Sequence, residues 1–266
     1  ELIRCCRKDR MSGRLKEAEG GSCMNKEQAR QYVWQELRKV AVPDSRFHLD
    51  FNEYIPDFLG SSEATRRFTA SDFYKEAQTI FITPDNCLEE LRARAIRDGK
   101  TLIVSTYGIF RGFVELVPDN FPEDHLIDYL VLLDSMEKAG RYISLKEIQQ
   151  QYSIDLIVTG ASAVSRSGIR FGKGHGYFDL EWAMLYEIGS VDADTPAAAF
   201  VHDCQVVDVP LEASTFDTVC DYIVTPTTIY TIPNAQKPEG GVVWDKLQPG
   251  MLESIPPLQV LKALDV

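Results

Sequence analysis

From about residue 79 onward, short and continuously apolar segments alternate with segments of helical pattern. The apolar segments lie at 79–82, 101–104, 155–159, 196–201 and 222–225, and helices are expected at 86–97, from residue 144 and at 179–188. Strands that are apolar throughout are typical of a parallel sheet covered on both faces. The pattern predicts an α/β protein: a three-layer α/β/α sandwich with a mostly parallel, Rossmann-like sheet and a ligand site at the carboxyl ends of the strands. Residues 107–142 follow neither pattern.

The first 23 residues differ from the rest of the chain. They contain no aromatic residue, carry mixed charges and hold three of the six cysteines, and Gly20-Gly21-Ser22 lies near their C-terminal end. We expect 1–23 to be a disordered N-terminal extension, or a segment upstream of a natural start at Met24. Residues 24–266 are expected to form a single α/β domain.

The charge balance limits the classes of partner. A net charge of −12 argues against general binding of nucleic acid, which needs a cationic surface. No stretch approaches the roughly 20 apolar residues of a membrane span, and no apolar leader precedes a small-residue cleavage site. The cysteines match no metal signature, so we expect them to be reduced. The sequence therefore favours a cytoplasmic protein, a monomer, that binds small molecules and neither nucleic acid nor membrane.

The segment 168–179 (GIRFGKGHGYFD) carries the strongest functional signal. Its glycines allow backbone conformations that a Cβ would forbid, so that amides can converge on an anion. Arg170 and Lys173 add positive charge, Asp179 adds a carboxylate, and a helix is expected to begin there. This combination is typical of a site for a triphosphate whose charge is shared between cations and a divalent metal ion.

Known phosphate motifs do not describe this segment. The GxGxxG dinucleotide fingerprint directly follows its strand, whereas 12 residues separate Thr159 from Gly172 here, and no Gly-Lys-Ser/Thr of a Walker loop is present. A flexible surface loop is the alternative reading of the glycines. The cations and the following helix favour phosphate binding.

A second cationic feature lies near the N-terminus. Asn25 can cap a helix in which Lys26, Arg30, Val33 and Leu37 share one face, and Pro43 is expected to end that helix. Two cations one turn apart are usually solvated, but the apolar half of this face indicates that they lie along the protein body.

Carboxylates and histidines offer further candidates. Asp179 is either a helix cap or a metal ligand, since Mg²⁺ takes one or two carboxylates plus phosphate oxygens. Asp217 lies just before the strand at 222–225, where its side chain could reach the same site. His175 and His202 are weak candidates for catalysis, because no HExxH motif and no nucleophile elbow accompany them.

These motifs together resemble the 5-formyltetrahydrofolate cyclo-ligase (methenyltetrahydrofolate synthetase) family. The segment 168–179 is similar to the family signature, Lys26 and Arg30 match its N-terminal Lys-x-x-x-Arg, and Asp217 with Asp221 matches an aspartate-rich segment before a late strand. Residues 172–184 and 201–208 are most similar to a divergent branch, the methenyltetrahydrofolate synthetase domain-containing proteins.

The resemblance implies an ATP- and Mg²⁺-dependent cyclisation of 5-formyltetrahydrofolate to 5,10-methenyltetrahydrofolate, in which phosphate activates the formyl oxygen. It implies Lys173, Arg170 and Tyr177 as catalytic residues and Asp179 with Asp217 as Mg²⁺ ligands. The implied ATP-binding residues are Lys26, Arg30, Arg170, Gly172, Lys173, Gly174, His175, Gly176, Tyr177 and Phe178.

The folate side departs from the family pattern. Typical members read Gly-Tyr-Tyr-Asp-Arg, where this chain has Phe178 and Leu180, and the candidates for folate contact are Glu63 and Phe58. Two other functions therefore stay open: an ATP-dependent enzyme of the same fold acting on a different formyl or pterin-like substrate, and a catalytically weak nucleotide-binding module.

Overall fold

Eight strands form the central sheet, in the order β13-β12-β10-β7-β3-β4-β5-β6. The computed structural model describes residues 6–8, 15–17, 26–121, 123–208 and 213–264. Five neighbouring strands are parallel: β12 (Tyr222–Val224), β10 (Ala197–Phe200), β7 (Leu156–Gly160), β3 (Thr79–Ile82) and β4 (Thr101–Ser105). These are the five strands that the apolar segments predict, and the mostly parallel sheet is confirmed.

The outer strands run the other way or lie beyond the predicted set. They are β5 (Phe113–Leu116), antiparallel to β4, then β6 (Arg141–Ile143), and at the opposite edge β13 (Ile229–Thr231), antiparallel to β12. Two of them occupy the segment 107–142, which the sequence pattern leaves unassigned.

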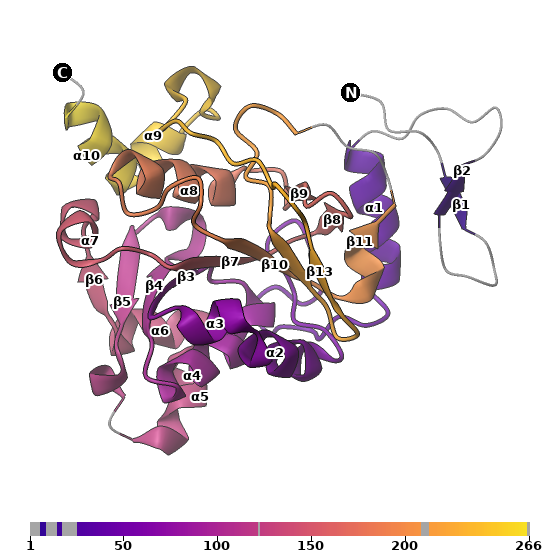
Figure 1. The fold of residues 1–266 in the computed structure, drawn as a ribbon, viewed down its shortest axis with the longest axis horizontal. Coiled ribbons are helices and arrows are strands. Elements are labelled where there is room, and N and C mark those ends of the chain that lie inside the picture. Colours follow the sequence, from indigo (N-terminus) through magenta and orange to yellow (C-terminus); the bar gives the residue numbers. More distant parts are fainter. Residues whose placement is uncertain (1–5, 9–14, 18–25, 122, 209–212, 265–266) are drawn as a thin grey trace.

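Alternate side chains of β3 enter two separate cores on opposite faces of the sheet. Ile80 and Ile82 of β3 pack with the helices of one face, and Phe81 packs with those of the other. The first face is covered by α2 (Ser61–Ala70), α3 (Asp72–Glu76), α4 (Glu89–Arg97), α5 (Ile127–Leu130) and α6 (Leu133–Ala139). The second is covered by α7 (Leu145–Gln151), α8 (Tyr177–Glu187), α9 (Met251–Ser254) and α10 (Pro256–Leu264). Figure 1 shows the two helical layers with the sheet between them, so the three-layer sandwich is confirmed.

A small sheet beside the main one carries the glycine segment. Its order is β11 (Val206–Val207), β8 (Ala163–Ser165) and β9 (Arg170–Phe171), and β8 with β9 forms an antiparallel hairpin. Figure 1 shows this sheet next to α1 (Lys26–Leu37). The helix α1 ends at Leu37, before the predicted end at Pro43, because the chain turns at 38–40. Near the N-terminus, β1 (Cys6–Lys8) pairs with β2 (Leu15–Glu17); the expected disorder of 1–23 otherwise falls outside the described residues.

The strand order creates one switch point. From β3 the chain crosses to β4 on one side, whereas β7 pairs with β3 on the other side. Loops that leave the carboxyl ends of β3 and β7 therefore diverge and open a crevice, which is where open α/β sheets bind their ligands.

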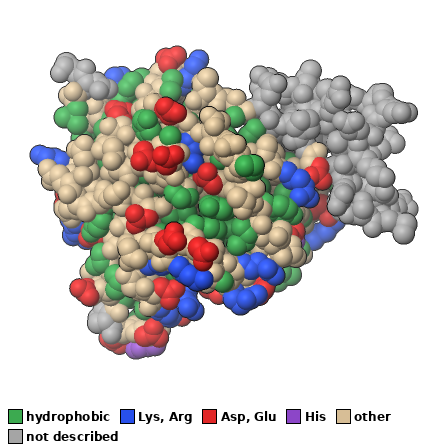
Figure 2. All heavy atoms as spheres, in the orientation of Figure 1, with side chains coloured by type: hydrophobic (Ala, Val, Ile, Leu, Met, Phe, Trp, Pro, Cys, Tyr) green, Lys and Arg blue, Asp and Glu red, His purple; other side chains and the backbone are tan. Residues whose placement is uncertain are grey.

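The surface mixes both charges. Figure 2 shows Lys and Arg side chains next to Asp and Glu over much of the visible face. Ion pairs join some of the charged residues of the protein, such as Arg97 with Asp124 and Asp128. No helix in the described part of the chain is both long and apolar enough to cross a membrane.

Candidate active site

A cavity of about 260 Å³ lies at the switch point between β3 and β7. Its walls come mainly from the ends of β3, β4 and β7, the glycine segment with the start of α8, and the helix α1, together with residues between α1 and α2 and before β12. The lining includes Arg30, Tyr54, Thr83, Asp85, Thr106, Tyr107, Thr159, Gly160, residues 170–179, Glu181, Phe216 and Asp217. The structure thus brings the glycine segment, Arg30 and Asp217 together.

Arg30 holds the glycine segment from the side of α1. Its Nε donates to the Gly172 carbonyl at 3.0 Å, and only 9% of the residue is exposed. Gly174 has φ +110°, which strongly favours glycine, and a Cβ there would lie 3.5 Å from the Arg30 guanidinium. Arg30 and Gly174 therefore form a positively charged site in which no side chain covers the backbone of Gly174. Lys26 lies one turn earlier in α1, but its side chain falls outside the described residues.

Arg170 supplies the second buried cation. Its side chain is 6% exposed, its guanidinium lies over the Phe178 ring at 4.1 Å, and its Nη2 is 3.8 Å from Asp179 Oδ2. Within the described residues its Nε has no hydrogen-bond partner. A buried guanidinium N–H without an acceptor is a donor available to an anion in the cavity.

Lys173 reaches across the cavity to the opposite wall. Its Nζ donates to the Glu53 carbonyl at 2.7 Å and lies 5.0 Å from the centre of the Tyr107 ring. Burial lowers the pKa of this ammonium, against the pull of neighbouring carboxylates. His175 lies 5.5 Å from the ring of Tyr177, and burial lowers its pKa as well.

Asp179 and Asp217 are the two carboxylates nearest the cations. Asp179 is the third residue of α8, and its Oδ1 accepts from the Thr218 amide at 2.9 Å instead of capping its own helix. Asp217 Oδ2 accepts from the Ser214 amide at 2.8 Å. Burial raises the pKa of Asp179; Arg170 lowers it and Asp217 raises it further.

The donor set suits a magnesium ion that also binds phosphate. No group of three or more His, Cys, Asp or Glu side chains that could hold a metal occurs among the residues that the structure describes. Mg²⁺ commonly takes only one or two carboxylates and completes its shell with phosphate oxygens and water. Asp179 and Asp217, both on the cavity wall, match that requirement.

The two predicted folate-contact residues lie elsewhere. Phe58 is 2% exposed and packs against Phe200 and His202 in the core. Glu63 is in the first turn of α2, where its side chain is 41% exposed and pairs with Arg66 and Arg67. Neither lines the cavity, so the structure does not bring them together with the glycine segment.

Other cavity residues escape the sequence reasoning. Asp85 bridges the ends of β3 and β7, because its Oδ2 accepts from Thr83 Oγ1 at 2.6 Å and from the Gly160 amide at 3.0 Å. Its place directly after a predicted strand was a usable signal. Glu181 is fully buried, and burial raises its pKa to about 8, with Ser105 and Arg170 opposing the rise. Its position four residues after Tyr177, on the same helical face, could have revealed it.

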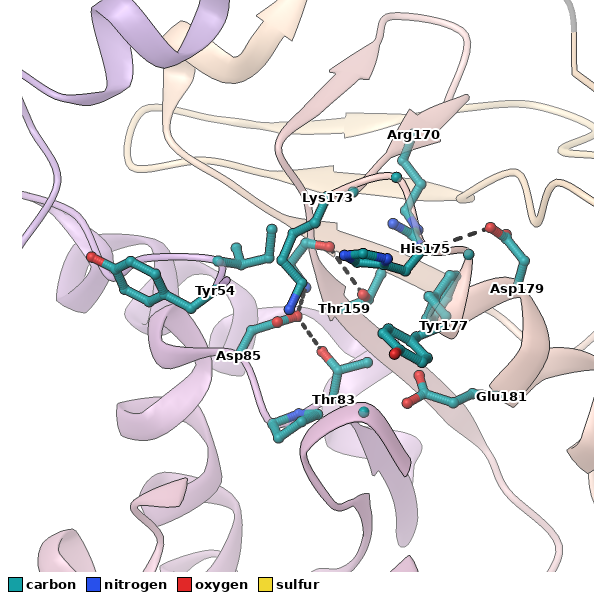
Figure 3. A pocket seen from close by; sticks show the side chains of 18 of the residues that line it. Tyr54, Thr83, Asp85, Thr159, Arg170, Lys173, His175, Tyr177, Asp179 and Glu181 are labelled. Carbon is teal, nitrogen blue, oxygen red and sulfur yellow. Dashed lines mark hydrogen bonds and ion pairs between the residues drawn. The ribbon is translucent and has the colours of Figure 1, made fainter. Parts of the chain in front are cut away.

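Figure 3 shows how these side chains divide the cavity. Tyr177 and Glu181 extend from the start of α8 into the cavity, whereas Asp179 points toward Arg170. Lys173 reaches down from the glycine segment toward Asp85. Arg170 and Asp179 thus lie together on one side, while Lys173 crosses the cavity toward Asp85 and Thr83.

Comparison with known proteins identifies the family. The sequence model of the 5-formyltetrahydrofolate cyclo-ligase family matches residues 23–226. The chain belongs to this family. The match to the cyclo-ligases spans α1, the glycine segment and Asp217, and the resemblance seen in the sequence is confirmed.

Curated relatives and a solved structure agree. The chain is 33% identical over 242 residues to the human methenyltetrahydrofolate synthase domain-containing protein and 34% identical to that of Bos taurus, covering 90% of this chain in each case. It spans only 62% of the length of those relatives. The NMR structure of Aquifex aeolicus 5,10-methenyltetrahydrofolate synthetase matches with a TM-score of 0.50 at 14% identity, over 80% of this chain and 96% of that one, which supports the cyclo-ligase fold.

The C-terminal segment lies beyond the part matched to the cyclo-ligase family. It still reaches the site, since Gln248 Nε2 donates to the Gly174 carbonyl at 3.0 Å. The Trp182 indole of α8 donates to the Pro238 carbonyl at 3.0 Å, which fastens this segment to the helix that carries Asp179. The glycine segment is therefore held from two sides.

Proposed function

We propose that this protein converts 5-formyltetrahydrofolate to 5,10-methenyltetrahydrofolate with ATP and Mg²⁺ as co-substrate and metal. The observation that carries the proposal is the convergence of Arg30, Arg170 and Lys173 on one glycine-lined cavity in a chain of net charge −12. Membership of the cyclo-ligase family supports the choice of reaction.

The phosphate side of the cavity would hold the ATP tail. Arg30 and Arg170 offer guanidinium donors, and Gly174 leaves room for a phosphate beside them. Phosphoryl transfer depends on positioning and charge neutralisation more than on covalent help from the protein. Asp179 and Asp217 would hold Mg²⁺, which would neutralise phosphate charge when bound.

Lys173 and Tyr177 would act at the reacting centre. The formyl oxygen of the folate takes up the terminal phosphoryl group and ADP leaves; N10 then attacks the formyl carbon and loses its proton, and phosphate departs with that oxygen. The partly buried Lys173 ammonium would stabilise charge on the transferring group, an interaction that desolvation strengthens. The ring of Tyr177 would form a wall that holds the substrate in line.

The decisive experiment supplies 5-formyltetrahydrofolate, ATP and Mg²⁺ and follows the product by its absorbance. Lys173→Ala should lower turnover about 10²–10³-fold, the usual cost of one charge-stabilising group. The exposed Lys75→Ala on α3 should leave turnover unchanged. ATP binding without product would reject the proposal in favour of a nucleotide-binding module, and turnover of another formylated compound would favour a different substrate.

A further inference from the structure

Glu181 is a buried carboxyl group for which phosphate binding has no use. It is 3% exposed, lies on α8 and lines the cavity. Its Oε2 makes no hydrogen bond to any residue that the structure describes. Leaving a buried polar atom unpaired costs about 1–3 kcal/mol, so an acceptor of this kind calls for a specific explanation. A ligand donor in the cavity supplies one.

The surroundings of Glu181 combine a polar edge with aromatic faces. Ser105, the last residue of β4, lies behind the carboxyl group, where it is fully buried and lowers the pKa of Glu181. Tyr177 precedes Glu181 by one helical turn, and Tyr107 follows Ser105 by two residues; both rings line the cavity. Figure 3 shows the Tyr177 ring next to the Glu181 carboxyl group. A carboxyl group beside two aromatic rings in one cavity suits a flat heterocycle.

We propose that Glu181 binds the pterin edge of the reduced folate. The carboxyl oxygens accept from adjacent ring N–H and amino donors, while Tyr177 and Tyr107 lie against the ring. The identity of the ring rests on the proposed function. Adenine fits this edge less well, because its amino group is flanked by ring nitrogens that only accept.

The position of Lys173 agrees with this assignment. Its ammonium interacts electrostatically with Glu181 and with Asp85, while its backbone belongs to the glycine segment. Lys173 therefore links the glycine segment to the part of the cavity that contains Glu181.

The test compares two ligands on three proteins. Calorimetry measures binding of 5-formyltetrahydrofolate and of its 2-desamino-2-methyl analogue to the wild type, to Glu181→Gln and to Glu187→Gln. Glu187 lies on the same helix, and its carboxylate accepts from the Val242 amide outside the cavity, so it is the matched control. Melting temperatures confirm that all three are folded.

We expect the wild type and Glu187→Gln to prefer the natural ring by about 10–100-fold, since a polar site rejects an analogue that leaves its acceptor unpaired. Glu181→Gln should bind both ligands within about threefold, with its Kd for ATP unchanged. Retained preference in Glu181→Gln, a change in ATP affinity instead, or no binding of either folate to the wild type would each overturn the inference. Folate binding that depends on Glu181, without turnover, would support the role of Glu181 and reject the proposed reaction. Turnover with folate binding that does not depend on Glu181 would support the reaction and reject the role of Glu181.

Discussion

Gly168 joins two parts of the candidate site, and substituting it should separate them. It lies between β8 and β9 with φ +83°, and its carbonyl accepts from the Cys220 amide at 3.0 Å. A Cβ at this position would lie 2.4 Å from the Cys220 carbonyl oxygen and 3.0 Å from Val219 Cγ1. The hairpin that ends in Arg170 would have to move away from the segment that carries Asp217.

Gly99 provides the matched control for this substitution. Its φ is +79°, nearly the same as that of Gly168, and a Cβ there meets no atom within 4 Å. Gly99→Ala should therefore cost only the left-handed backbone penalty of about 1–2 kcal/mol. Gly168→Ala should cost that penalty plus about 1–3 kcal/mol for overpacking, or roughly 2–5 kcal/mol in total.

Urea unfolding of both variants measures these costs, and calorimetry with ATP and Mg²⁺ measures the effect on the site. We expect Gly168→Ala to weaken nucleotide binding and Gly99→Ala to leave it unchanged. If the two free energies of unfolding fall by the same amount within about 0.5 kcal/mol, the steric reasoning is refuted. Unchanged ATP affinity in a folded Gly168→Ala protein would show that this contact does not position Asp217.

Two further substitutions test the site. Arg92 is fully buried and donates three hydrogen bonds to backbone carbonyls, two of them in the loop after β3. Arg92→Met should therefore lower the free energy of unfolding by about 2–5 kcal/mol. A decrease below about 1 kcal/mol in urea unfolding would contradict this prediction. Asp179→Asn keeps an acceptor for the Thr218 amide but removes the charge, so it should weaken ATP binding at least tenfold with Mg²⁺ and little with EDTA. Equal affinities for wild type and variant with Mg²⁺ present would remove Asp179 from the metal site.

The parallel strands could be predicted because their side chains are buried on both faces of the sheet. Strands such as 79–82 and 156–160 are apolar on both faces, and such segments stand out in a sequence. Strand β5 contains Glu115, which is buried only because Arg141 and Tyr152 hold its carboxylate. These partners are distant in sequence, so the interruption of the apolar run hid the strand.

The residues of the candidate site also fall into those that the sequence could reveal and those that only the fold brings together. The glycine segment is a local signal, and its cations could be recognised without any tertiary information. The contact between Arg30 and Gly172 joins residues 142 positions apart, and only the fold creates it. Phe58 is a substrate candidate only through the family resemblance, which does not fix the direction of a side chain, and its ring enters the core against Phe200.

The hydrogen bonds that fix the glycine segment explain how a chain with a net negative charge can present backbone amides to an anion. Arg30 binds the carbonyl of Gly172, and Gln248 binds the carbonyl of Gly174. In a trans peptide the N–H points opposite to the C=O of the same unit, and the described residues contain no cis peptide bond. The amides of Lys173 and His175 must then point away from Arg30 and Gln248. Donors outside the loop thus fix these two carbonyls, and with them the directions of the two amides, before any phosphate binds, so that little ordering has to accompany binding.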